Sequence, residues 1–259
     1  MTSKMWKAAR RPLAVGGIVA SQLAQAIHRP DLDSLTDQDP SGTFGDPSLP
    51  PLRIVVLGDS TVTAPGVEPL DDAWIRRTAL ALTDRYFVDV ASLAVGGSKV
   101  EDVRREQVHR AALVGGDLAI VCVGGNDALR MTPVSRFEAD YDVVARVLVE
   151  AFPAVGFSGV GDMGAIPRLP ALAAGFARVR ARSIDHAIGR VASRYGVPKS
   201  QAWGAAFDLF TNDPAAWAPD LFHASGRGHA VYAQAAMPLV DEALRRAGFA
   251  RRGSDESST

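Results

Sequence analysis

The sequence predicts an α/β domain in which helices cover both faces of a doubly wound, parallel sheet of about five strands. Short apolar runs alternate with longer amphipathic segments, which is the pattern of repeated βαβ units. A chain of 259 residues, 47% of them hydrophobic, is long enough to bury one substantial core. No internal repeat is visible. We therefore expect a three-layer α/β/α sandwich.

The expected strands are apolar runs that end in glycine or polar residues. They cover residues 53–57, 87–93, 118–123 and 155–160, with 202–208 as a short edge strand. The expected helices cover residues 72–85, 100–114, 134–151, 171–195 and 225–247. Ser225 stands at the start of the last helix, where its hydroxyl can accept a backbone N–H of the first turn.

The first 27 residues have the order of charges expected of an export signal or a signal anchor. Basic residues precede a mildly apolar stretch over 12–27, which ends in Ala24-Gln25-Ala26. Glycines and glutamines dilute the stretch, and it is shorter than the roughly 20 apolar residues that cross a bilayer. Export or anchoring through this segment and a cytoplasmic location are both open.

Three further segments complete the predicted organisation. Residues 28–51 are rich in Asp, Ser, Gly and Pro without apolar periodicity, which predicts a flexible linker. The folded domain is expected over residues 52–248, and the polar tail 249–259 has the composition of a disordered segment.

Charge, cysteine content and histidine spacing argue against a nucleic-acid partner, a disulfide and a metal site. The 28 basic and 29 acidic side chains give a net charge of -1, so no field of one sign attracts nucleic acid. Cys122 is the one cysteine, which rules out an intramolecular disulfide, and it lies in an apolar run. The histidines lack the spacing of metal ligands, so no metal is expected.

Three loops with reactive or hydrogen-bonding groups follow the first three strands. Ser60 lies in Gly58-Asp59-Ser60 at the carboxyl edge of the sheet, where α/β sheets bind ligands. After the second strand, Gly96 and Gly97 allow a backbone amide to approach a ligand closely. Asn126 follows the third strand and can donate to a developing negative charge. Each motif alone is also compatible with an ordinary turn.

The fourth motif is Asp220-Leu221-Phe222-His223, directly before the last helix. Asp220 can accept the Nδ1 proton of His223 and leave Nε2 facing a nucleophile. A serine activated in this way forms covalent acyl intermediates.

In this order, the four motifs resemble the sequence blocks of the SGNH hydrolase (GDSL-like lipase/esterase) superfamily, particularly its small bacterial single-domain members. The resemblance covers residues 53 to about 244 and implies a flavodoxin-like fold. It maps the residues that give the superfamily its name onto Ser60, Gly97, Asn126 and His223. Ala64 and Ser92 replace residues common in the family, glycine and asparagine, and neither position supplies a catalytic group.

The resemblance implies a serine hydrolase that cleaves carboxylic esters through an acyl-enzyme on Ser60, without a cofactor. It implies a triad of Ser60, His223 and Asp220. It also implies an oxyanion hole formed by the N–H groups of Ser60 and Gly97 and the Asn126 amide. Asp59 and Asp127 are interpreted as residues that brace the loops. The expected partner is a small-molecule or lipid-like ester.

Two alternative functions keep the same fold. One is an O-acetyl esterase or acyltransferase that acts on a cell-envelope glycan. The other is a non-catalytic binding domain, which the presence of every catalytic group disfavours.

Residues 159–164 match G-x-G-x-x-G after a predicted strand, a pattern typical of dinucleotide sites. Pro167 and Pro170 follow, where a dinucleotide site needs a continuous helix, so a cofactor is not expected. We interpret the segment as a rim of the active site, with Met163, Ile166 and Leu169 offering apolar surface to the substrate.

Overall fold

The computed structural model describes residues 16–28, 31 and 34–249. Within these residues, five strands form one mixed sheet in the order β1-β3-β2-β4-β5. The strands are β1 (Gly42–Phe44), β2 (Pro51–Gly58), β3 (Phe87–Ser92), β4 (Leu118–Cys122) and β5 (Ala154–Phe157). β2, β3, β4 and β5 are parallel, whereas β1 runs antiparallel to β3 at the edge. The predicted α/β architecture is confirmed, and the sheet is mixed because of β1.

Helices make up most of the remaining described chain. They are α2 (Ser60–Thr63), α3 (Trp74–Leu80), α4 (Val100–Asp102), α5 (Val108–Val114), α6 (Gly125–Leu129), α7 (Val134–Ala151), α8 (Ala171–Tyr195), α9 (Leu209–Asn212) and α10 (Gly226–Arg246). A π-helical turn, Val103–Gln107, joins α4 to α5. Short 3-10 turns cover Leu70–Asp72, Met163–Ala165, Ala205–Asp208 and Pro214–Ala216.

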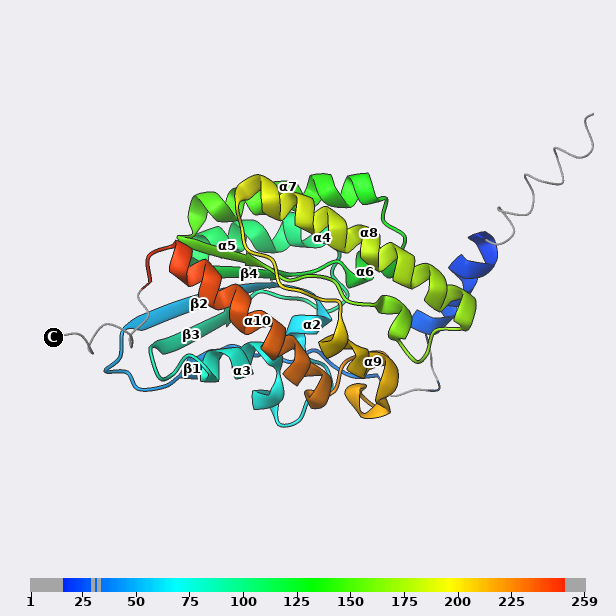
Figure 1. The fold of residues 1–259 in the computed structure, drawn as a ribbon, viewed down its shortest axis with the longest axis horizontal. Helices are drawn as coiled ribbons and strands as arrows, with labels where there is room; N and C mark the ends of the chain where they lie inside the picture. Colours follow the sequence, from blue (N-terminus) through cyan, green and yellow to red (C-terminus); the bar gives the residue numbers. More distant parts are fainter. Residues whose placement is uncertain (1–15, 29–30, 32–33, 250–259) are drawn as a thin grey trace, which may run out of the picture.

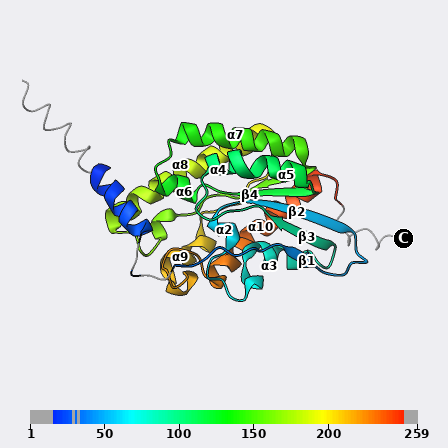
Figure 2. The same cartoon turned by 180° about the vertical axis from the view of Figure 1, so that it is seen from behind.

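The helices form one layer on each side of the sheet, as Figures 1 and 2 show from opposite directions. Helices α4, α5, α7 and α8 cover one face, and α3 and α10 cover the other. The β2 side chains alternate between the two layers: Val55 and Leu57 face the first core, Ile54 and Val56 the second. All four are fully buried, as expected of a parallel strand covered on both faces.

The chain order places the crevice of the sheet beside β2. From β2, the chain moves to β3 on one side and then returns to β4 on the other. Ligands bind at the carboxyl ends of strands where the order reverses in this way. Ser60 lies two residues after the end of β2, at this crevice.

The strand predicted over residues 202–208 is wrong, because this segment contains the 3-10 turn Ala205–Asp208. Gly204 has a φ of 107°, which begins the turn, and no apolar alternation follows because Ala205 and Ala206 are exposed. The helix expected over 100–114 is interrupted by the π-helical turn. Ser225 caps α10 as predicted, since its hydroxyl accepts the N–H of Gly228.

The flexible linker predicted over residues 28–51 is contradicted where the structure describes residues 34–51. Residues 42–44 form β1, with Gly42 opposite Val90. The Asp37 carboxylate accepts hydrogen bonds from Gly96 N–H and the Thr63 hydroxyl at 2.8 and 2.6 Å. Polar side chains and strand pairing attach the segment to the domain. An attachment of this kind does not require apolar periodicity in the sequence.

The N-terminal helix, residues 16–27, lies beside the start of α8 in both views (Figures 1 and 2). Among the described residues, no helix is long and apolar enough to cross a membrane. Residues 1–15 of the predicted leader lie outside the described residues, as does the predicted tail beyond Phe249.

Candidate active site

Ser60 is the first residue of α2, directly after a tight turn at the end of β2. Asp59 caps the helix: its carboxylate accepts the N–H of Thr61 at 2.9 Å. Burial raises the pKa of Asp59 and opposes the effect of its hydrogen bonds, which lower the pKa. The turn thus presents Ser60 at the carboxyl edge of the sheet, as the sequence predicts.

Gly58 and Gln107 fix the backbone that leads into this turn. A Cβ on Gly58 would lie 2.1 Å from the carbonyl oxygen of Cys122, so only glycine fits. The buried Gln107 side chain accepts Gly58 N–H at 2.9 Å and donates to Gly58 O at 3.0 Å. It also donates to the Ser98 hydroxyl at 3.2 Å, which connects the serine turn to the loop after β3.

Asp220 and His223 form a hydrogen-bonded pair in the loop before α10. His223 Nδ1 lies 2.6 Å from Asp220 Oδ2, and the N–H groups of Phe222 and His223 both donate to Asp220 Oδ1 at 3.0 Å. The Asp220 side chain is 4% exposed and the His223 side chain 23%. The ring is therefore held through Nδ1, and Nε2 is left for another partner.

The charge of Asp220 is stabilised by these contacts. Burial alone would raise the pKa of Asp220, but hydrogen bonds from the His223 ring and from two backbone N–H groups outweigh it and lower the pKa. Asp220 is accordingly ionised at neutral pH, the state in which it orients a histidine base.

Asn126 lies in the first turn of α6, and its amide is held between two loops. Its Nδ2 donates to Ser98 O at 3.2 Å and to Asp59 Oδ2 at 3.4 Å. Asp127, the next residue, accepts the N–H of Val100 at 2.9 Å. Asp59 and Asp127 thus brace the loops around Ser60 and Asn126, as expected from the sequence.

Gly97 belongs to the turn after β3 and has a φ of 76°, a conformation that favours glycine. The preceding Gly96 N–H is bound by Asp37, and the following Ser98 carbonyl is bound by Asn126. Both contacts fix the turn next to the loop of Asn126. Gly97 itself is not among the described residues that line the cavity beside Ser60.

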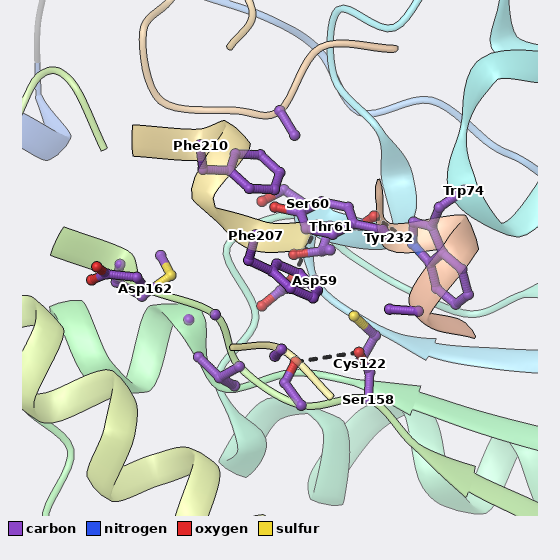
Figure 3. Close-up of a pocket in the computed structure, with 18 of the residues that line it drawn as sticks. Asp59, Ser60, Thr61, Trp74, Cys122, Ser158, Asp162, Phe207, Phe210 and Tyr232 are labelled. Carbon is purple, nitrogen blue, oxygen red and sulfur yellow. Dashed lines mark hydrogen bonds between the residues drawn. The ribbon is translucent and has the colours of Figure 1, made fainter. Parts of the chain in front are cut away.

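A single cavity contains Ser60, Asn126 and His223 in its wall. Its volume is about 130 Å³, many times the roughly 10–15 Å³ that one water needs by the same measure. Figure 3 shows Trp74, Tyr232 and Cys122 on one side of Ser60 and Asp162 on the other. Phe207 and Phe210, labelled in the same view, also line the cavity. The cavity therefore extends in both directions from the serine.

Two of the three predicted rim residues line this cavity. Met163 and Ile166 are part of its wall. Leu169 is not among the described residues lining it; its buried side chain packs in the cluster that holds the N-terminal helix. The apolar rim extends less far along the chain than the sequence predicts.

His229, which no sequence motif identifies, also belongs to the cavity wall. Burial lowers the pKa of His229 to about 3, so its ring is neutral, and Nδ1 accepts Trp74 N–H at 3.1 Å. The Trp74 indole N–H donates in turn to Thr61 O at 2.8 Å. His229 thus positions Trp74 against the serine turn, a role distinct from that of His223.

The aromatic residues Phe207, Phe210 and Tyr232 were also missed. Phe210 and Tyr232 stack with ring centroids 5.2 Å apart, and Phe210 meets Trp217 edge to face at the same separation. They come from segments that are separated in sequence and meet only in the fold, so no local motif identifies them.

The glycines of the 159–164 motif serve packing. A Cβ on Gly164 would lie 2.4 Å from Ala174 O, and one on Gly159 would lie 2.8 Å from Ser200 O. Only a three-residue 3-10 turn, Met163–Ala165, follows the strand, which does not fit a dinucleotide site. In the part of the chain that the structure describes, no cluster of three or more metal-ligating side chains occurs.

Solved esterase structures share this fold. The psychrotrophic esterase EstA from Pseudoalteromonas sp. has a TM-score of 0.60 at 11% identity, covering 74% of this chain and 98% of its own. Axe2, an acetylxylan esterase from Geobacillus stearothermophilus, has a TM-score of 0.57 at 15% identity, covering 78% and 97%. LAE5, an α/β hydrolase from the metagenome of Lake Arreo, Spain, has a TM-score of 0.58 at 20% identity, covering 80% and 97%.

Sequence comparison adds the family. No curated protein matches the chain. A model of the GDSL-like lipase/acylhydrolase family matches residues 56–231, a span that includes Ser60, Asn126 and the Asp220–His223 pair. The chain therefore belongs to the GDSL-like lipase/acylhydrolase family and is a carboxylic ester hydrolase of that family.

Proposed function

We propose that this hydrolase cleaves its ester through an acyl-enzyme on Ser60, with His223 as base and Asp220 as the carboxylate that orients it. One observation carries the proposal: Ser60 and His223 line the same cavity, while Asp220 occupies His223 Nδ1 at 2.6 Å. A histidine held in this way has its Nε2 free to accept the hydroxyl proton of serine.

The reaction then proceeds in two halves. Ser60 Oγ attacks the ester carbonyl and His223 Nε2 takes its proton; collapse of the tetrahedral intermediate releases the alcohol, which His223 protonates. Water, deprotonated by His223, next attacks the acyl-enzyme; collapse of the second tetrahedral intermediate releases the carboxylic acid, and His223 returns the proton to Ser60 Oγ. The N–H groups of Ser60 and Gly97 and the Asn126 amide are the proposed donors to the oxyanion. The support for Asn126 is its position in the cavity wall.

The lining of the cavity favours an apolar acyl group of small to medium size. Trp74, Leu129, Phe207, Phe210 and Leu239 contribute apolar surface to the cavity that contains Ser60. Apolar walls with a few placed polar groups are typical of sites for small organic ligands.

An O-acetylated sugar is the second candidate substrate, because Axe2, a protein of the same fold, is described as an acetylxylan esterase. The exposed Gln201 and half-buried Asp162 in the cavity wall offer polar contacts to a sugar. Turnover of aryl acetate and aryl octanoate, compared with acetate release from acetylated xylooligosaccharides, separates the two. Octanoate turnover well above both acetate reactions supports the acyl-chain substrate, and preferential release from the sugar contradicts it.

Replacement of the proposed triad tests the mechanism. We expect Ser60→Ala and His223→Ala each to lower kcat by about 10³-fold or more, with unchanged thermal unfolding. Hydrolysis of an aryl ester and the melting temperature are measured in parallel. Retention of full activity by Ser60→Ala would refute the proposal.

Asp220→Asn provides a finer test of the same triad. The amide retains an acceptor for the backbone N–H groups but holds His223 in the wrong tautomer, so we expect kcat to fall by about a hundredfold or more. Steady-state kinetics on the same ester measure the effect. An Asp220→Asn enzyme with wild-type kcat would show that Asp220 has only a structural role.

A further inference from the structure

The N-terminal helix is docked on the protein by one apolar face. Val19, Leu23 and Ala26 are 4%, 2% and 3% exposed, and their spacing places them on one side of the helix. They share an apolar cluster whose other buried members are Leu129, Ile166, Leu169, Ala173 and Ala177. The helix is therefore part of the packed structure in the region it contacts.

Leu129 and Ile166 belong both to this cluster and to the wall of the active-site cavity. They are 2% and 3% exposed, so each side chain fills the space between the cavity and the helix. Side chains in a packed interior keep their positions because their neighbours occupy the adjacent volume. Loss of the helix contacts therefore frees two residues of the cavity wall to move outward.

Arg168 connects the same helix to the proposed catalytic loop. Its guanidinium donates to Ile27 O at 3.3 Å and to Asp220 O at 3.4 Å, and it lies 5.1 Å from the ring centroid of Phe222. The last carbonyls of a helix lack partners within the helix, so Arg168 satisfies one of them. The end of the N-terminal helix and the loop of Asp220 and His223 are thus held by one side chain.

This helix lies outside the part of the chain that the family model matches, which begins at residue 56. EstA is covered over 98% of its length by only 74% of this chain. The N-terminal helix therefore lies outside the region of this chain that the family model matches.

We propose that the N-terminal helix is a specificity element of the esterase site. It holds Leu129 and Ile166 against the cavity and, through Arg168, steadies the loop of Asp220 and His223. With the helix in place, the cavity limits the acyl group to small or medium size; without its support, the cavity admits longer acyl groups in greater proportion. The inference rests on the proposed function, because it concerns the acyl group of the same ester.

Leu23→Ala in the full chain tests the proposal, with Ile18→Ala as a matched control. Ile18 lies on the same helix but is 50% exposed, so its truncation leaves the docked face intact. The kcat/KM values are measured for aryl acetate and aryl octanoate. We expect Leu23→Ala to raise the octanoate-to-acetate ratio by about fivefold or more, and Ile18→Ala to change it by less than about twofold.

A second variant, a chain that begins at residue 28, removes the helix entirely and is used once its cooperative thermal unfolding has been verified. A raised octanoate-to-acetate ratio in this variant supports the proposal. An unchanged ratio in both Leu23→Ala and the shortened chain overturns it.

Labelling of the wild-type enzyme by a fluorophosphonate probe distinguishes this failure from failure of the proposed function. Labelling of Ser60 with an unchanged ratio refutes only the role of the helix. Absence of Ser60 labelling refutes the acyl-enzyme and the inference together.

Discussion

Asp127 adjoins the proposed oxyanion donor Asn126 but is a buried residue that braces a loop. Its Oδ2 accepts the N–H of Val100 at 2.9 Å. Burial raises the pKa of Asp127 to about 6. The carboxylate is therefore less favourable in the folded chain than in the unfolded one.

Asp127→Asn should change how stability depends on pH. Because the folded pKa is raised from 3.8 to about 6, the stabilising contribution of Asp127 is complete below 3.8 and is lost as pH rises through about 6. Asparagine keeps the acceptor for Val100 N–H without this loss. As pH rises from 4 to 7, we expect the free energy of unfolding of the variant to gain up to about 3 kcal/mol relative to wild type, the free energy that corresponds to a pKa raised from 3.8 to about 6.

Thermal or denaturant unfolding at a series of pH values measures the difference. The other titrating groups are common to both proteins, so the comparison isolates Asp127. Parallel stability curves for wild type and Asp127→Asn across this range would contradict the raised pKa.

At the residue scale, the sequence identifies residues whose partners are close in the chain. Asp220 and His223 are three residues apart and hydrogen bond as expected. Gln107 binds Gly58, 49 residues away, and His229 binds Trp74, 155 residues away. A polar residue with a distant partner carries no local signal, which is why both were missed.

At the scale of the secondary-structure element, helix α10 both packs in the core and lines the active-site cavity. Leu239 and Val240 pack in the core beneath the sheet, and Leu239 also lines the cavity. Ala235 and Ala236 belong to the cavity wall, and Ala236 packs against the same core. Small side chains at these two positions leave room between the helix and the serine turn. The helix thus contributes to both the fold and the volume available to substrate.

Ala236→Leu should shorten the acyl group that the cavity accepts. The added carbons occupy cavity volume, so we expect kcat/KM for aryl octanoate to fall by about tenfold or more while that for aryl acetate changes by less than about threefold. Ala233→Leu is the matched control, because Ala233 lies on the same helix and is buried in the core rather than in the cavity wall.

Rates with both esters and the melting temperatures of both variants make the comparison. Equal losses for octanoate and acetate in Ala236→Leu, matching those in Ala233→Leu, would indicate general overpacking and refute the role of Ala236 in substrate selection.

At the element scale, strong periodicity decides what can be predicted. The parallel strands and the long helices α7, α8 and α10 have clear apolar patterns and lie where expected. β1 has three residues with only Phe44 buried, too few for a period to be visible. Residues 202–208 are apolar enough in sequence to suggest a short strand, but their burial does not alternate and the segment contains the turn Ala205–Asp208.

At the scale of the whole molecule, residues 34–50 form a tether, a segment that is hydrogen bonded to the loops of the active site. Asp37 binds the turn of Gly96 and the Thr63 hydroxyl at the end of α2, and Gln38 donates to Ala64 O and Val67 O at 2.7 and 3.1 Å. These contacts join the loops that follow β2 and β3. Composition alone suggests a linker here because the contacts are polar and distant in sequence.

Asp37→Ala should impair activity more than it impairs folding. It releases the turn that carries Gly97, so we expect kcat to fall by about tenfold or more if Gly97 N–H contributes to the oxyanion hole. Asp39→Ala is the matched control, since Asp39 makes its hydrogen bonds to Ser41.

Kinetics and melting temperatures of the two variants are compared with wild type. A wild-type kcat in Asp37→Ala would contradict a role for the tether in positioning the oxyanion turn. An equal loss in Asp39→Ala would contradict the specific role of Asp37.

The central claim is that Ser60 forms the covalent intermediate, and covalent capture tests it most directly. Folded enzyme is treated with a fluorophosphonate probe, and the adduct is located by intact mass and peptide mapping. We predict one adduct per chain, on Ser60, that is lost in Ser60→Ala and strongly slowed in His223→Ala. An adduct on another residue, or none on folded and active enzyme, would contradict the account.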